Sequence, residues 1–156
     1  LASVAPDGTP HVRTVVIRSF DADEMTLTFF TDARSPKIAE LKHQPIIQIM
    51  SYDPVSHEQM RIVGTADIHT EDELTRKSWQ NIPEYGRGDY LTRLPPGSVI
   101  SSPELIQHDH TLEDEYFTVI QVKISAIDWL KLSAQGHKRA LLTWQDGNFS
   151  GEWRTP

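Results

Sequence analysis

The chain has 156 residues, a net charge of −7, and 38% hydrophobic and 24% charged residues. This length suits a single domain with one sizeable core, and the composition is that of an ordinary globular protein. The acidic balance argues against sequence-independent nucleic-acid binding, which depends on neutralising phosphates. An anionic ligand therefore needs a local cluster of basic side chains.

The sequence contains no cysteine. This excludes disulfide scaffolds, thiolate metal sites, iron–sulfur clusters and cysteine nucleophiles. No apolar run approaches the roughly 20 residues that a membrane span needs, and no signal peptide is visible. We therefore expect a cytoplasmic protein that binds neither nucleic acid nor membranes.

The first third of the chain predicts a strand meander. Residues 1–4 form an apolar run that ends a strand, and the APDG sequence at 5–8 is a turn. Residues 10–19 and 25–31 are rich in β-branched and aromatic side chains and predict two strands, separated by a polar turn.

A helix is predicted to begin at Ser35-Pro36 and to end at Gln44-Pro45. We expect the Ser35 hydroxyl to accept an N–H of the first turn, and Pro36 suits the first helical position. Ile38 and Leu41 share one face of this helix, and Glu40 is predicted to lie elsewhere.

The remainder predicts further strands and one irregular excursion. Strands are expected at 46–52 and 59–69 around the loop 53–57, at 116–131, and as a terminal hairpin of 138–144 and 149–153 across the turn 145–148. The TEDE sequence at 70–73 resembles a capping box that opens a helix towards Asn81. The proline-rich stretch 83–110 is a connecting or functional excursion, with a short helix near 89–93.

These elements show no alternation of strands and helices. They predict a mainly β, α+β protein, an antiparallel barrel with a few peripheral helices, over the single domain 1–156. Neither a dinucleotide-binding glycine motif nor a P-loop is present.

Three basic residues fall close together: Arg13, Arg18 and Lys37. Lys37 lies in the first turn of the predicted helix, where free N–H groups and the helix dipole favour anions, so Ser35 and Thr31 complete a candidate phosphate site. Alternation along one strand places Arg13 and Arg18 on opposite faces. They would then contact different parts of one ligand, and the alternative is that all three are ordinary surface residues.

Other candidate ligand contacts are single residues. Gln59 begins a strand, and its amide both donates and accepts, as recognition of a ring carbonyl beside an N–H requires. Trp129 suits a flat ligand and Arg139 an anion, although a core tryptophan and an exposed arginine are the alternatives. The QHDH sequence at 107–110 is a weak metal motif, more typical of a loop, and we predict no metal site.

Together these residues carry a resemblance to the pyridoxamine 5′-phosphate oxidase-like family of FMN-binding split β-barrels. RTVVIR at 13–18 resembles the family's flavin-binding strand, and Phe30-Thr31 its aromatic–threonine pair. SPK at 35–37 resembles its phosphate motif. Gln59, Trp129 and Arg139 match its later flavin contacts in order and spacing.

The resemblance implies a six-stranded split barrel and a homodimer with FMN at its interface. One subunit would hold the phosphate, and the second subunit would contribute Gln59, Trp129 and Arg139. Arg18 would face both flavin and substrate, and His137 would contact substrate. The phosphate and strand positions that the resemblance assigns to the first subunit are Arg13, Thr14, Val16, Phe30, Thr31, Ser35 and Lys37.

Some positions depart from the oxidase pattern, as in a divergent branch of the family. Pro36, Arg18 and Gln135 stand where the oxidase has arginine, lysine and arginine, and the middle segment lacks its tyrosine, arginine and serine phosphate contacts. The resemblance therefore implies FMN binding more directly than oxidation of pyridoxamine phosphate.

Three hypotheses remain open. The first is an FMN-dependent oxidoreductase acting on a small-molecule substrate or electron donor, with no catalytic residue assigned. The second is a non-catalytic module that holds FMN, a deazaflavin or haem, the last needing His108, His110 or His137 as axial ligand. The third is a barrel without cofactor, which alanine at Arg13 and Lys37 would identify by leaving ligand content unchanged.

Overall fold

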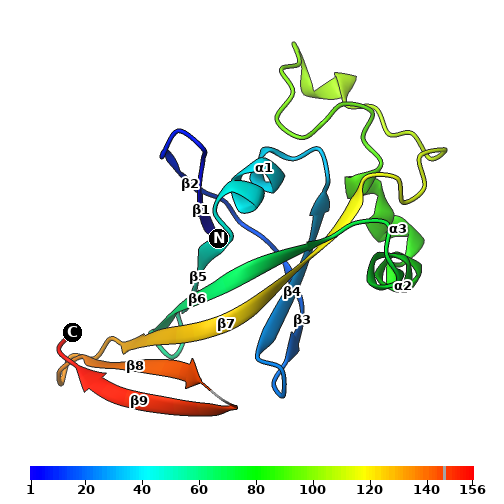
Figure 1. Ribbon diagram of the computed structural model, residues 1–156. Coiled ribbons are helices and arrows are strands. Elements are labelled where there is room, and N and C mark those ends of the chain that lie inside the picture. The colour runs from blue at the N-terminus through cyan, green and yellow to red at the C-terminus, as the bar shows by residue number, and fades with distance from the viewer. Residues whose placement is uncertain (146) are drawn as a thin grey trace.

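The computed structural model describes residues 1–145 and 147–156. Its strands form one antiparallel sheet in the order β2-β1-β5-β6-β7-β4-β3, and β8 pairs with β7 and β9 (Figure 1). The strands are β1 (Ala2–Val4), β2 (Pro10–Val12), β3 (Ile17–Asp21), β4 (Thr26–Asp32), β5 (Ile46–Asp53), β6 (Glu58–His69), β7 (Phe117–Lys131), β8 (Lys138–Gln145) and β9 (Asn148–Arg154). The helices are α1 (Pro36–His43), α2 (Glu73–Asn81) and α3 (Glu84–Arg87), with 3₁₀ turns η1 (Gly88–Tyr90) and η2 (Pro103–Leu105).

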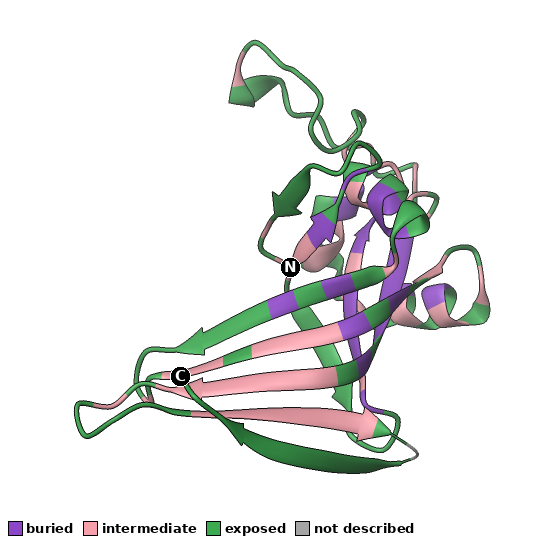
Figure 2. Ribbon diagram, turned by 60° about the vertical axis from the view of Figure 1, so that its left-hand side comes forward, coloured by how far each residue is buried: buried purple, intermediate pink, exposed green. Residues whose placement is uncertain are grey.

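The long strands β6 and β7 organise the sheet. The first half of β7 pairs with β4, its second half pairs with β8, and β6 follows it on the other side throughout. Buried residues gather where β4, β6 and β7 meet α1, whereas the β8–β9 hairpin is half-buried to exposed (Figure 2). The chain is thus a packed barrel region with a long, open extension of its sheet.

The main core lies between the sheet and α1. Phe29, Ile120 and Val122 are fully buried, and Ile38 and Leu41 of α1 pack against them, as the helical pattern predicted. A second cluster lies under α2, where the rings of Trp79, Tyr90 and Phe117 meet edge to face or tilted.

The mainly β, antiparallel architecture is confirmed, but two strand predictions were wrong. The sheet has nine strands among the described residues and not six, and these include the predicted terminal hairpin, β8–β9. The single strand predicted at 10–19 is two strands, because β2 pairs with β1 and β3 pairs with β4 at the opposite end of the strand order. Residues 13–16 cross between them, so strict alternation does not relate Arg13 to Arg18.

The helix starts also differ from the prediction in detail. Ser35 precedes α1, but its hydroxyl makes no capping bond and accepts a hydrogen bond from Lys37 instead. The predicted capping box is replaced by Asp72, whose carboxylate accepts the Thr75 N–H at 2.8 Å. The proline-rich segment contains α3, η1 and η2, and η1 overlaps the start of the short helix predicted near 89–93.

Arg34 joins the proline-rich segment to the barrel. Its guanidinium pairs with buried Asp32 at 2.7 Å and lies 3.7 Å from the ring centre of Tyr116. It also donates to the backbone carbonyls of Thr92 and Arg93, at 2.8 and 3.1 Å. This arginine therefore fixes the segment, at Thr92 and Arg93, beside the end of β4.

Gly64 is required where β6 and β7 shift register. A Cβ at this position would lie 2.6 Å from Val122 Cγ1 and 2.7 Å from the Lys123 carbonyl oxygen. We expect Gly64→Ala to lower the free energy of unfolding by about 1–3 kcal/mol, because the backbone must shift to relieve the overlap. Urea denaturation measures the loss. Gly88→Ala is the control, since its Cβ would meet nothing within 4 Å, and equal stability of the two variants would contradict the prediction.

Candidate functional site

A lysine and two hydroxyls meet at the start of α1. The Lys37 ammonium donates to Thr31 Oγ1 at 2.6 Å and to Ser35 Oγ at 2.8 Å. Thr31 and Ser35 are buried, and Lys37 is half-buried. Burial lowers the pKa of Lys37, and the nearby positive charge of Arg13 lowers it further. Two neighbouring cations with hydroxyls at a helix N-terminus favour an anion.

Arg13 lies in the crossing between β2 and β3, where residues of β1 and α1 accept hydrogen bonds from its side chain. Its guanidinium donates to Ser3 Oγ at 2.5 Å and to Glu40 Oε2 at 2.7 Å. A guanidinium has five N–H donors in a rigid fork, and these two bonds leave others to meet a ligand. Lys37, Ser35 and Thr31, which the sequence proposed as one phosphate site, thus come together, and Arg13 lies close enough to lower the pKa of Lys37.

Arg18 lies on β3 at the edge of an open cleft of about 1210 Å³. Its guanidinium lies 5.7 Å from the ring centre of Phe30 and donates to the Tyr90 hydroxyl at 3.4 Å. The cleft is floored by β4, β6 and β7 and bordered by α2 and α3. Thr14 and Val16 are exposed in the crossing between Arg13 and Arg18.

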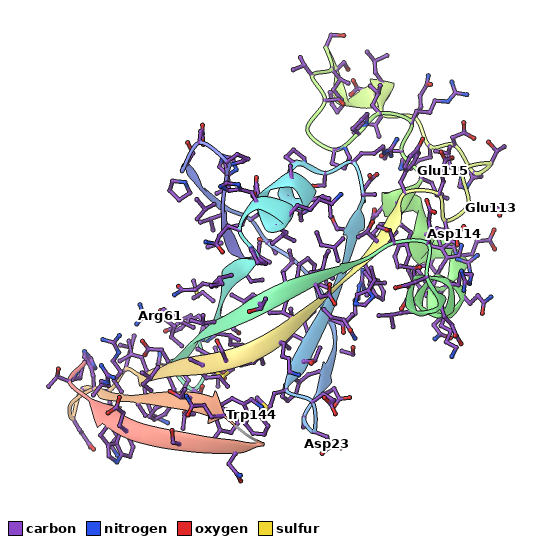
Figure 3. The ribbon with its side chains drawn as sticks, viewed as in Figure 1. Asp23, Arg61, Glu113, Asp114, Glu115 and Trp144 are labelled. Atoms are coloured by element: carbon purple, nitrogen blue, oxygen red, sulfur yellow. The ribbon has the colours of Figure 1, made fainter. Side chains whose placement is uncertain are left out.

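Gln59 and Arg139 lie on another part of the sheet, towards the outer ends of β6 and β8. Both register with Leu130 of β7, so they share one face. Asp128 accepts two hydrogen bonds from Arg139, at 3.0 and 2.7 Å, and one from Arg61, which Figure 3 shows near the outer part of β6. The bonds from Arg139 and Arg61 lower the pKa of Asp128.

Trp129 and His137 are not brought into that group. Trp129 precedes Leu130 in β7 and so faces the opposite side of the sheet, where its ring centre lies 6.4 Å from that of Trp153. His137 is exposed in the turn before β8, and its Nδ1 accepts the Ser133 N–H at 3.1 Å.

Neither a metal-binding cluster nor a membrane-spanning helix is present among the described residues. Residues 1–145 and 147–156 contain no group of three or more His, Cys, Asp or Glu side chains placed to hold a metal ion. None of their helices has both the length and the apolar character to cross a membrane.

Comparison with known proteins gives consistent matches. The family model described as pyridoxamine 5′-phosphate oxidase, FMN-binding domain, matches residues 1–70. The crystal structure of a pyridoxamine 5′-phosphate oxidase-related, FMN binding protein from Nostoc punctiforme superposes with a TM-score of 0.82 at 26% identity, covering 99% of this chain and 86% of that one. The chain is therefore similar to the pyridoxamine 5′-phosphate oxidase-like, FMN-binding proteins, in sequence over residues 1–70 and in fold over nearly its whole length. Both the matched domain and the Nostoc punctiforme protein are described as FMN-binding.

Curated relatives match over part of their length. Pyridoxine/pyridoxamine 5′-phosphate oxidase 2 of Arabidopsis thaliana is 40% identical over 68 residues, which are 44% of this chain and 34% of the relative. The Nostoc punctiforme pyridoxine/pyridoxamine 5′-phosphate oxidase is 30% identical over 107 residues, 69% of this chain and 48% of the relative. The chain thus spans from about a third to about half of the length of these relatives.

The cluster at the start of α1 suits FMN chemically. A phosphate monoester carries up to two negative charges and three acceptor oxygens, and Arg13 and Lys37 offer two cations beside the two hydroxyls. Pro36 supplies no third cation, and it occupies the first position of α1 without disturbing this group.

Sequence reasoning missed the residues that hold the two arginines. Glu40 was predicted away from the buried face, yet it is 2% exposed and lies behind Arg13. Asp128 was overlooked beside Trp129, although alternation along β7 places it on the face of Arg139. Cross-strand pairing of β7 with β8 was a usable signal for Asp128, whereas the position of Glu40 along its helix gave no signal of its burial.

Proposed function

We propose that this chain is an FMN-dependent oxidoreductase whose Lys37, Thr31 and Ser35, with Arg13, hold the FMN phosphate. The observation that carries the site is the half-buried Lys37 ammonium, 2.6 and 2.8 Å from two hydroxyls at the start of α1. Burial and the charge of Arg13 lower the pKa of Lys37, because both disfavour a charged ammonium. The negative charge of a bound phosphate would stabilise that ammonium.

The flavin ring is proposed to extend from this phosphate towards Arg18 and Phe30. These two residues follow along β3 and β4 and border the cleft of about 1210 Å³, which offers room for a substrate beside the ring. Bound FMN supplies the acceptance and release of electrons. The Arg18 guanidinium would stabilise negative charge on the reduced ring, and the Tyr90 hydroxyl and Phe30 ring orient it.

A second copy of the chain is proposed to complete the site. In one chain Gln59 and Arg139 lie on the outer extension of the sheet and not at α1. β5 also presents a row of exposed apolar side chains on that face, namely Ile46, Met50 and Tyr52. Apolar rows of this kind favour association, so a homodimer would cover them and bring Gln59 and Arg139 to the partner's flavin.

Arg18→Met tests the proposed role of this arginine at the ring. We expect FMN to remain bound and its midpoint potential to fall by roughly 30–60 mV, because the reduced, negatively charged flavin loses a neighbouring cation. Spectroscopic titration with a reference dye measures the potential. Arg76→Met is the control, since Arg76 is exposed on α2 and does not line the cleft. Equal midpoint potentials in the two variants would show that Arg18 does not contact the flavin ring.

The oxidoreductase assignment is tested by anaerobic reduction of the bound FMN. Reduced nicotinamides, amines and alcohols are offered in turn, and the flavin absorbance is followed. A donor that bleaches the flavin at a saturable rate supports an enzyme. If dithionite reduces the bound flavin but none of these donors reduces it, the non-catalytic binding module is favoured.

A further inference from the structure

Glu40 is a buried carboxylate beside the proposed phosphate site. It lies in the second turn of α1, and its side chain is 3% exposed. Ser3 donates to Oε2 at 2.5 Å, Arg13 donates to the same oxygen at 2.7 Å, and His11 Nδ1 lies 2.7 Å from Oε1. Although burial opposes ionisation, these bonds lower the pKa of Glu40 to about 2. Glu40 is therefore an anion at neutral pH.

Glu40, Ser3 and Arg13 form a closed ring of hydrogen bonds. Arg13 uses one terminal nitrogen on Ser3 Oγ and the other on Glu40 Oε2, while Ser3 donates to that same carboxylate oxygen. Because the guanidinium is planar and rigid, two contacts through different nitrogens fix its plane as well as its position. Ser3 itself is 3% exposed, so the ring rests on β1 and α1 and not on mobile surface groups.

The charge of Glu40 does not by itself favour phosphate binding. It lies close enough to Lys37 to raise that residue's pKa and would repel an anion in the same pocket. If the Glu40 carboxylate favours phosphate binding, it must do so by an effect other than its charge. Orientation of Arg13 is the effect that the hydrogen-bond geometry supports.

We propose that Glu40 is a positioning residue for FMN, which with Ser3 holds the Arg13 guanidinium ready for the phosphate. This inference rests on the proposed function, in which Arg13 contacts that phosphate. Glu40 does not touch the cofactor. It lowers the loss of side-chain freedom that Arg13 would otherwise undergo on binding.

The test is a double-mutant cycle on binding to the apoprotein. Dissociation constants for FMN and for riboflavin, which lacks the phosphate, are measured by flavin fluorescence in Arg13→Ala, Glu40→Ala and the combined variant. We expect Glu40→Ala to weaken FMN about 10-fold and riboflavin less than about 2-fold. The combined variant should bind FMN no more weakly than Arg13→Ala alone, since Glu40 acts only through Arg13.

Two further variants separate orientation from charge and from folding. Glu40→Gln keeps an oxygen that accepts from Ser3 and Arg13, so it should recover most of the FMN affinity. Ser3→Ala removes the other partner of Arg13 with a smaller change to the core and should weaken FMN in the same selective way. Lys42→Ala, exposed on α1, is the control for the helix.

Any other result of these binding measurements overturns either the proposed phosphate site or the proposed role of Glu40. If Arg13→Ala leaves FMN affinity unchanged, the proposed phosphate site is wrong. If Arg13→Ala weakens FMN but Glu40→Ala weakens FMN and riboflavin equally, or adds its full effect to that of Arg13→Ala, Glu40 is a structural residue only. Tighter FMN binding by both Glu40→Ala and Glu40→Gln would show that its charge, and not its orientation of Arg13, dominates.

Discussion

Lys37→Met is expected to weaken FMN binding by about 10- to 100-fold. A charge-assisted hydrogen bond contributes about 1.5–3 kcal/mol, and each 1.36 kcal/mol is a factor of ten in affinity. Methionine keeps the length of the side chain over Thr31 and Ser35 but removes the ammonium that contacts both hydroxyls. Titration of the apoprotein with FMN, followed by flavin fluorescence, measures the change.

The affinity for riboflavin, which lacks the phosphate, distinguishes a lost phosphate contact from a disrupted fold. Lys37→Met should bind riboflavin as the unaltered protein does, because the ring contacts lie elsewhere. Lys42→Met, on the exposed side of the same helix, should bind both flavins normally. If Lys37→Met reduces riboflavin and FMN affinity by the same factor, Lys37 does not contact the phosphate.

A subunit-mixing experiment is expected to restore FMN binding from two defective variants. One variant carries Arg13→Ala and Lys37→Met, and the other carries Arg139→Ala. If each flavin site takes its phosphate contacts from one subunit and Arg139 from the other, a mixed dimer has one intact site and one doubly defective site. Random mixing makes about half of the dimers mixed, so about a quarter of all sites should regain tight FMN binding.

The mixed sample is prepared by joint refolding or coexpression with two different affinity tags. Sequential purification on both tags isolates mixed dimers, which should bind one FMN per dimer with the affinity of the unaltered protein. Each variant alone is the control. Mixed dimers with no tight FMN site would show that Arg139 and Lys37 serve the same site within one subunit. If no protein carrying both tags is recovered, the chain does not form a stable dimer.

The grouping of Lys37, Thr31 and Ser35 was predictable from sequence because its signals are local. Ser35-Pro36 marks a helix start, and Lys37 and Thr31 lie within a few residues of it, so their proximity follows from helix geometry. The spacing of Ile38 and Leu41 likewise predicted the face of α1 that packs into the main core.

What escaped prediction depends on long-range pairing. The break at residues 13–16 follows from β2 and β3 joining opposite ends of the strand order, which the β-branched run at 10–19 does not encode. Glu40 is buried because β1 and β2 bring Ser3, His11 and Arg13 against α1, so its helical face alone could not place it. Trp129 faces away from Arg139 because of strand register, which spacing along the chain does not reveal.

The most direct measurement of the central claim compares the affinities of the unaltered apoprotein for FMN and riboflavin. The two ligands share the ring and differ by the phosphate, so their ratio reports the phosphate site alone. With two cations and two hydroxyls at the start of α1, we expect FMN to bind at least about 100-fold more tightly. Equal affinities for the two flavins would contradict a phosphate site at Arg13, Thr31, Ser35 and Lys37.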